Sequence, residues 1–161
     1  MSAGSATGTK QSRDSWAALL EASAREVFEL MLGSELAELP PTDLKPSPGI
    51  TSMVGLAGSL SGIIAVRTSL KGAAAMAEKM LGMALEETDP QCWDAAGEVA
   101  NMVAGNFKNK LNTHDEQCVL SVPTVIAGES YTLHPLGASA EVCLKLAFDG
   151  LPLFVTLDVE Q

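Results

Sequence analysis

Alternation of apolar and polar residues is the clearest pattern in this chain, and it lies near the carboxyl end. Between Ala140 and Phe148 every second residue is apolar, and Asp149-Gly150 comes directly afterwards. A period of two indicates a β-strand with one buried face, and Asp-Gly favours the tight primed turn of a hairpin. The pattern therefore predicts a β-hairpin whose second strand includes Leu153, Val155 and Leu157. The first strand should place Val142, Leu144, Leu146 and Phe148 on one side and Glu141, Cys143 and Lys145 on the other.

Other β-rich segments occur on both sides of the middle of the chain. Ile50–Gly58 and Gly62–Thr68 are separated by a short Ser-Leu-Ser turn, which predicts a second hairpin. Residues 118–122 and 124–127 are further strand candidates, and Gly128-Glu129 is expected to turn into another at Tyr131–Leu133. The proline-rich stretch from Leu39 to Gly49 fits either an extended connection or an edge strand.

Three segments have helical periodicity and end signals. The first helix is expected to begin at Ser12 or Asp14 and to end at Gly33, with Glu21, Glu26 and Glu29 on a solvated face. A short helix follows over residues 73–81, capped by Thr68 or Ser69 and closed by Gly82. The third opens at Asp89-Pro90 and should reach about Asn112. This order of elements predicts an α+β fold in which helices cover one face of a largely antiparallel sheet.

Length and composition limit the classes of protein to consider. A chain of 161 residues suits one domain, and we expect a disordered tail over residues 1–13 and a single domain over 14–161. Only 4% of the residues are aromatic and the formal charge is −10. Both features argue against nucleic acid as a partner, and the charge also argues against an anionic membrane surface. The longest apolar runs are far too short to cross a bilayer.

Cysteines and histidines offer no metal or redox pattern. Cys92, Cys118 and Cys143 are widely spaced and contain no Cys-x-x-Cys pair, so we interpret each as a small buried residue in a reducing cytoplasm. His114 and His134 lie far apart and outside any cluster of ligand residues. No metal site is therefore expected in this chain.

The third helix has a polar stripe that could carry chemistry. At about 100° of rotation per residue, Asp94, Glu98, Asn101 and Gly105 share one face, and the opposite face is apolar. The apolar face contains Trp93, Ala100, Val103, Phe107 and Leu111. The stripe is either the ordinary solvent side of an amphipathic helix or a surface that acts on a partner.

An acid and an amide could act on a substrate that brings its own reactive group. Asn101 can hold a water in line with an acyl phosphate because an amide both donates and accepts hydrogen bonds. Glu98, one turn earlier, could pair with a lysine of the partner. Gly105 leaves two alternatives open, namely clearance for a partner or close packing of the helix on the sheet.

These residues resemble a known family. Asp94-x-x-x-Glu98-x-x-Asn101, followed by Pro123, resembles the signature of the CheC/CheX/FliY chemotaxis phosphatases. Similar neighbours support the likeness: Met80-Leu-Gly82, Asn101–Asn106, Val122–Gly128 and the Asp149-Gly150 turn. The likeness covers about residues 14–159. One copy of the motif indicates the single-site CheX type.

The resemblance implies a function and a set of roles. It implies a phosphatase of two-component signalling that hydrolyses the phosphoaspartate of a phosphorylated CheY-like receiver domain. Asn101 would orient the attacking water and Glu98 would contact a receiver lysine, whereas the role of Asp94 is open and Pro123 would be structural. Mg²⁺ would belong to the receiver, so the chain would need no cofactor of its own. The resemblance also implies a homodimer joined through its sheets. The alternative is a non-catalytic receiver-binding module related to the middle domain of FliM.

Overall fold

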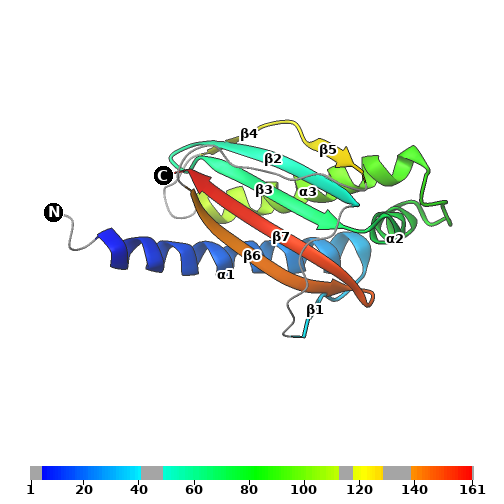
Figure 1. Ribbon diagram of the computed structural model, residues 1–161, viewed down its shortest axis with the longest axis horizontal. Helices are drawn as coiled ribbons and strands as arrows, with labels where there is room; N and C mark the ends of the chain where they lie inside the picture. The colour runs from blue at the N-terminus through cyan, green and yellow to red at the C-terminus, as the bar shows by residue number, and fades with distance from the viewer. Residues whose placement is uncertain (1–4, 41–48, 113–117, 129–138, 161) are drawn as a thin grey trace.

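A seven-stranded antiparallel sheet and three helices form the part of the molecule that the structure describes. The computed structural model describes residues 5–40, 49–112, 118–128 and 139–160 (Figure 1). The helices are α1 (Ser5–Leu32), α2 (Leu70–Leu81) and α3 (Pro90–Asn112). The strands are β1 (Ala37–Glu38), β2 (Ile50–Gly58), β3 (Gly62–Thr68), β4 (Cys118–Leu120), β5 (Thr124–Ala127), β6 (Ser139–Phe148) and β7 (Leu151–Glu160).

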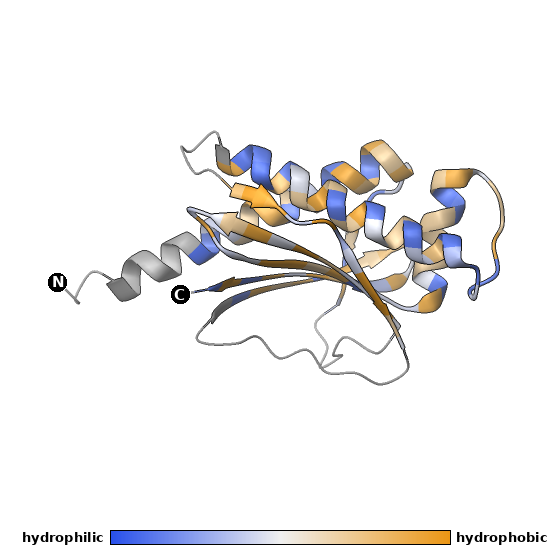
Figure 2. Cartoon of the chain, turned by 90° about the horizontal axis from the view of Figure 1, so that it is seen from above, coloured by the Kyte–Doolittle hydropathy of each residue, from blue (hydrophilic) through white to orange (hydrophobic). Residues whose placement is uncertain are grey.

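The strand order is β1-β6-β7-β3-β2, and both β4 and β5 pair with the free side of β2. The helices gather on one face of this sheet (Figure 2). Apolar side chains of the helices and of the covered sheet face form a large core cluster and a smaller one between α2, α3 and Ile50. In the large cluster Phe28 and Phe148 meet edge to face at 5.2 Å between ring centroids. The α+β architecture predicted from the sequence is confirmed.

Both predicted hairpins are present. Strands β2 and β3 have the expected bounds and pair from Ile50 opposite Thr68 to Leu56 opposite Gly62. Strands β6 and β7 pair over their full length around Asp149 and Gly150, whose φ angles of 49° and 81° are those of the primed turn. The predicted sides of β6 are confirmed. Val142, Leu146 and Phe148 are buried and Leu144 is half-buried, whereas Glu141, Cys143 and Lys145 are exposed.

Capping explains the bounds of α2 and the end of α1. Ser69 accepts a hydrogen bond from the backbone N–H of Gly72 at 3.0 Å, and Gly82 ends α2 in the left-handed region. Gly33 ends α1 in the same way, and the Ser34 N–H donates to the carbonyl of Phe28 at 2.9 Å. This pattern of bonds satisfies carbonyls that the last turn leaves free. Gly33 and Gly82 were both predicted as stops.

The start of α1 differs from the prediction. The helix begins at Ser5, not at Ser12 or Asp14, so residues 5–13 are helical where a disordered tail was expected. Alanine, threonine and serine there carry no apolar period, so no periodic signal predicts a helix. The proline-rich residues 41–48, the segment around Tyr131 and both histidines lie outside the described residues. No described helix is long and apolar enough to span a membrane.

Candidate functional site

The helix that carries the polar stripe begins at a well-defined cap. The Asp89 carboxylate accepts a hydrogen bond from the Gln91 N–H at 2.9 Å, and the Asp89 carbonyl accepts from the Cys92 N–H at 2.9 Å. Pro90 occupies the first helical position, where no N–H is needed. The predicted start of α3 is therefore confirmed, and this start fixes which residues face outward.

Contacts on three sides hold α3 in place. On the sheet side, the buried Ser52 hydroxyl of β2 donates to the Ala96 carbonyl at 2.9 Å. On the α1 side, Glu26 accepts from Lys110 Nζ at 2.9 Å and from Asn106 Nδ2 at 3.0 Å. On the third side, Val125 of β5 lies against Gly97. Side chains on the remaining face are thus presented from a rigid element, as a preorganised site requires.

Glu26 also gives a pH-dependent link between α1 and α3. The hydrogen bond from Lys110 is the main cause that lowers the pKa of Glu26 below its ordinary value of 4.5. A lowered pKa stabilises the folded state above that ordinary value, and the contribution is lost as the pH falls through the folded-state pKa. The Glu26 side chain is 46% exposed, so screening keeps the contribution below about 1 kcal/mol. The predicted solvated face is thus only part of its role.

We expect Glu26→Gln to lower the free energy of unfolding by less than about 1 kcal/mol at neutral pH. The difference from the unmodified chain should disappear as the pH falls below the ordinary glutamate value of 4.5. Urea titrations at neutral and acidic pH measure this, with Glu29→Gln, exposed on the same helix, as the control. A constant difference across this pH range would contradict the assigned ion pair.

The structure places the predicted site residues together on the outward face of α3. Asp94, Glu98 and Asn101 are exposed, and Gly105 is half-buried one turn farther along. Among the residues that the structure describes, neither Glu98 nor Asn101 has a hydrogen-bond or ion-pair partner. On the opposite face Ala100, Val103, Phe107 and Leu111 are buried, as predicted. An acid and an amide are thus available to a partner.

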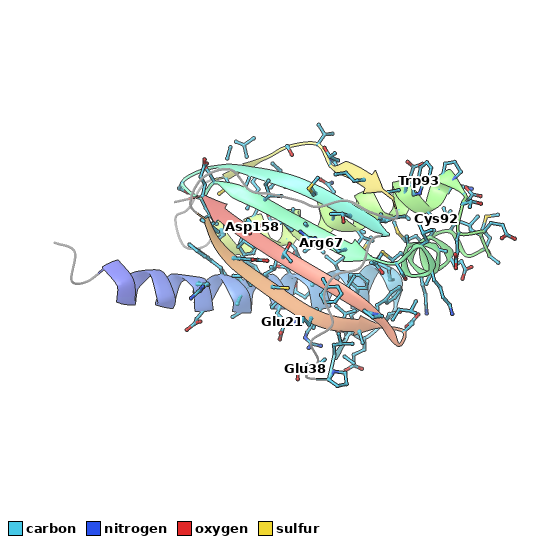
Figure 3. All side chains as sticks on the ribbon, viewed as in Figure 1. Glu21, Glu38, Arg67, Cys92, Trp93 and Asp158 are labelled. Atoms are coloured by element: carbon cyan, nitrogen blue, oxygen red, sulfur yellow. The ribbon has the colours of Figure 1, made fainter. Side chains whose placement is uncertain are left out.

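Trp93 departs from the prediction. It was expected on the apolar face, yet 40% of its surface is exposed. The periodicity of a helix gives the direction of a side chain, but burial also requires another element to cover that position. Figure 3 shows Trp93 near the amino-terminal end of α3.

Gly97 is a site residue that the sequence analysis missed. A Cβ atom added to Gly97 would lie 3.1 Å from Val125 Cγ2 and 3.9 Å from Pro123 Cβ. The same addition at Gly105 would meet nothing within 4 Å. Close packing against a strand is therefore the role of Gly97, and it does not explain Gly105. The spacing of Pro123 from the helix motif has a structural reason, because Pro123 lies where β5 approaches Gly97.

The cysteines divide into two groups. Cys92 and Cys118 are buried as predicted, and burial raises the pKa of the Cys92 thiol above its ordinary value. Cys143 is exposed, so its prediction was wrong: it lies on the alternating strand β6, on the face away from the helices. In the described part of the chain, no group of His, Cys, Asp and Glu could hold a metal ion.

The uncovered sheet face has its own polar groups. Arg67 of β3 and Asp158 of β7 both lie on the sheet in Figure 3. Burial raises the pKa of Asp158, and the charge of Arg67 opposes that rise. A small pocket on this part of the molecule is lined by Arg67, Thr68, Ser69, Pro152 and Phe154. None of these residues belongs to α3, so the pocket is separate from the acid and the amide.

Comparison with known proteins gives the family. Residues 50–147, more than half of the chain, match the model of the family described as chemotaxis phosphatase CheX. This chain belongs to the CheX family. The matched range includes β2, β3, α2 and all of α3, and with them the motif from Asp94 to Asn101.

Individual relatives agree with the CheX assignment. The chain is 35% identical over 98 residues to the CheY-P phosphatase CheX of Thermotoga maritima, a match that covers 61% of this chain and 57% of that protein. The chain therefore spans less than two thirds of that relative.

Solved CheX structures share the fold. A CheX-CheY-BeF3-Mg²⁺ complex from Borrelia burgdorferi matches with a TM-score of 0.76 and 25% identity, covering 91% of this chain and 98% of that one. The CheX protein of Vibrio vulnificus matches with a TM-score of 0.79 and 20% identity, covering 92% and 98%.

Proposed function

We propose that this CheX-family chain hydrolyses the phosphoaspartate of a CheY-like receiver domain. The observation that carries the proposal is the exposed pair Glu98 and Asn101, one turn apart on a helix that is held on three sides. The relative named as a CheY-P phosphatase and the relative solved as a complex with CheY support the same substrate. Asp94 and Gly105 are assigned to the contact with the receiver.

The proposed reaction needs few groups from this chain. The oxygen of a water forms a bond to phosphorus while the bond from phosphorus to the aspartate oxygen breaks, which gives inorganic phosphate and a free aspartate. Asn101 orients that water by accepting one of its hydrogen bonds, and positioning of this kind supplies much of the rate in phosphoryl transfer. Mg²⁺ is proposed on the receiver, and the complex of the Borrelia relative with CheY contains BeF3 and Mg²⁺. Glu98 pairs with a receiver lysine, and this contact sets how far the Asn101 side chain enters the receiver's active site.

Glu98→Gln should therefore weaken docking more than chemistry. We expect KM for the phosphorylated receiver to rise about tenfold with a small change in kcat, because the lost charge acts on association. The loss should shrink at high salt, which already screens the pair in the unmodified protein. The assay is steady-state loss of phosphate from a receiver kept phosphorylated with acetyl phosphate and Mg²⁺.

Glu29→Gln is the matched control for Glu98→Gln. It removes the same charge from an exposed position on α1 and should leave KM unchanged. Equal effects of the two substitutions would show that only net charge matters and would contradict the assigned contact. Binding of phosphorylated receivers without any turnover would favour the non-catalytic module. The homodimer stays a prediction that sedimentation analysis can test.

A further inference from the structure

An apolar border lies on the β5 side of the acid and the amide. It consists of Trp93, Val122 and Pro123. Trp93 is 40% exposed and Val122 is 84% exposed, the largest exposed fraction among the large hydrophobic residues that the structure describes. Pro123 is half-buried beside Gly97 of the helix. Exposed aromatic and β-branched side chains next to a functional face are typical of a protein interface.

Helix geometry relates this border to Asn101 through Gly97. Trp93, Gly97 and Asn101 are four residues apart in turn, so each is a neighbour of the next along α3, and Trp93 and Asn101 differ by about 80° around the helix axis. Pro123 lies against Gly97, the middle residue of these three. The distance from Trp93 to Asn101 along the helix axis is about 12 Å, because each residue adds about 1.5 Å.

The path of the edge strands brings Val122 to the level of Asn101. The first half of α3 packs near Ile50 and Val125, whereas Phe107 packs in the cluster that contains Leu56 and Cys118. The segment from β4 to β5 thus runs antiparallel to α3. A Cβ at Gly97 would lie near both Pro123 and Val125, so Gly97 is level with Thr124, two residues beyond Val122. Two strand residues span about 6.6 Å, which is about the rise of four helix residues.

A bulge turns Val122 out of the sheet. The Ser121 N–H donates to the Gly55 carbonyl at 2.9 Å, and the Gly55 N–H donates to the Ser121 hydroxyl at 2.8 Å. Pairing resumes at Thr124 opposite Met53. Two residues, Val122 and Pro123, therefore stand against the single residue between Gly55 and Met53. Bulges of this kind re-aim side chains and are frequent next to active sites.

We propose that the apolar border is the docking strip for the receiver domain, an inference that rests on the proposed function. A standard interface buries about 800 Å² on each partner, which corresponds to a disc of about 16 Å radius. A receiver that admits Asn101 into its active site must therefore cover surface next to the amide. On the α1 side that surface includes the polar group of Glu26, Asn106 and Lys110, and the end of α1 also exposes Leu30 and Met31. On the β5 side it is apolar and lacks a partner within the described part of the chain.

The test compares Trp93→Ala and Val122→Ser with Val119→Ser. Val119 is 70% exposed on the same edge of the sheet. It pairs with Ala57, and paired residues point to the same face of a sheet. Ala57 is an odd number of residues from Ser52, which faces the helices, so Val119 faces away from them. We expect KM for the phosphorylated receiver to rise about tenfold in the first two variants and kcat to stay unchanged. Val119→Ser should behave as the unmodified chain. Val119 and Val122 are mostly exposed, so their replacement should affect folding little. Trp93 is only 40% exposed, so the thermal unfolding of Trp93→Ala is measured as well.

Different outcomes separate this proposal from the proposed function. If the unmodified chain does not accelerate dephosphorylation of the receiver, the proposed phosphatase activity is refuted. The docking strip is then tested by titrating each variant with a beryllofluoride-activated receiver, and Trp93→Ala and Val122→Ser should bind it about tenfold more weakly than Val119→Ser. An active unmodified chain with equal KM values for all three variants would overturn the docking strip alone. The docking strip would also be overturned if sedimentation showed that Val122→Ser dissociates a dimer while the receiver affinity is unchanged. The apolar border would then bind a second copy of this chain.

Discussion

Replacement of Asn101 with alanine should abolish the acceleration of receiver dephosphorylation and leave receiver binding nearly intact. The amide is the group proposed to hold the attacking water, so its loss should lower kcat by two to three powers of ten. That factor corresponds to about 3–4 kcal/mol of transition-state stabilisation. Because Asn101 is exposed and has no partner among the described residues, its removal should leave the free energy of unfolding within about 0.5 kcal/mol.

Asn109 provides the control for this experiment. It is an exposed asparagine on the same helix, two turns farther along, and Asn109→Ala should keep the activity of the unmodified chain. The measurement is single-turnover loss of phosphate from a receiver in Mg²⁺, combined with a titration against the beryllofluoride-activated form. Full activity of Asn101→Ala would contradict the proposed mechanism, and loss of binding in parallel with kcat would assign Asn101 to docking.

Local signals were sufficient to predict most of the fold. Asp149-Gly150 requires positive φ angles that few other pairs adopt, and alternation then fixes the register of β6 and β7. Asp89 and Pro90 fix the start of α3, so the face of Glu98 and Asn101 followed from counting residues. The first turns of α1 could not be predicted, because small residues without a period give no signal of helix or coil.

The surroundings of the site depend on contacts between distant segments. Gly97 has no side chain because Val125 packs close to its backbone. Val122 is exposed because the bulge at Ser121 turns it outward. Neither contact produces a sequence pattern with a fixed spacing. Glu26 was expected in solvent, but it binds a lysine 84 residues away. The periodicity of a helix shows which residues face away from the core. It does not show which neighbours lie beside them.

Substitution of Gly105 should have opposite effects on the stability and on the activity of the protein. Glycine within a helix is about 1 kcal/mol less favourable than alanine, and an added Cβ at Gly105 meets no atom within 4 Å. Gly105→Ala should therefore raise the free energy of unfolding by up to about 1 kcal/mol. Gly97→Ala should gain less, because its Cβ must displace Val125 at 3.1 Å. Thermal or urea unfolding of the two variants measures this difference.

The activity of the same position should change in the other direction. If Gly105 is kept so that a receiver can approach the backbone of α3, a larger side chain will hold the partner away from Asn101. Displacement of about 1 Å can already lower a rate by about a hundredfold, so Gly105→Leu should remove nearly all phosphatase activity while the chain stays folded, and Gly105→Ala should lie between. A glycine that served only the fold would lose stability and activity together. Retained activity in a stabilised Gly105→Leu variant would place the receiver elsewhere, since nothing within the described chain occupies the space above this residue.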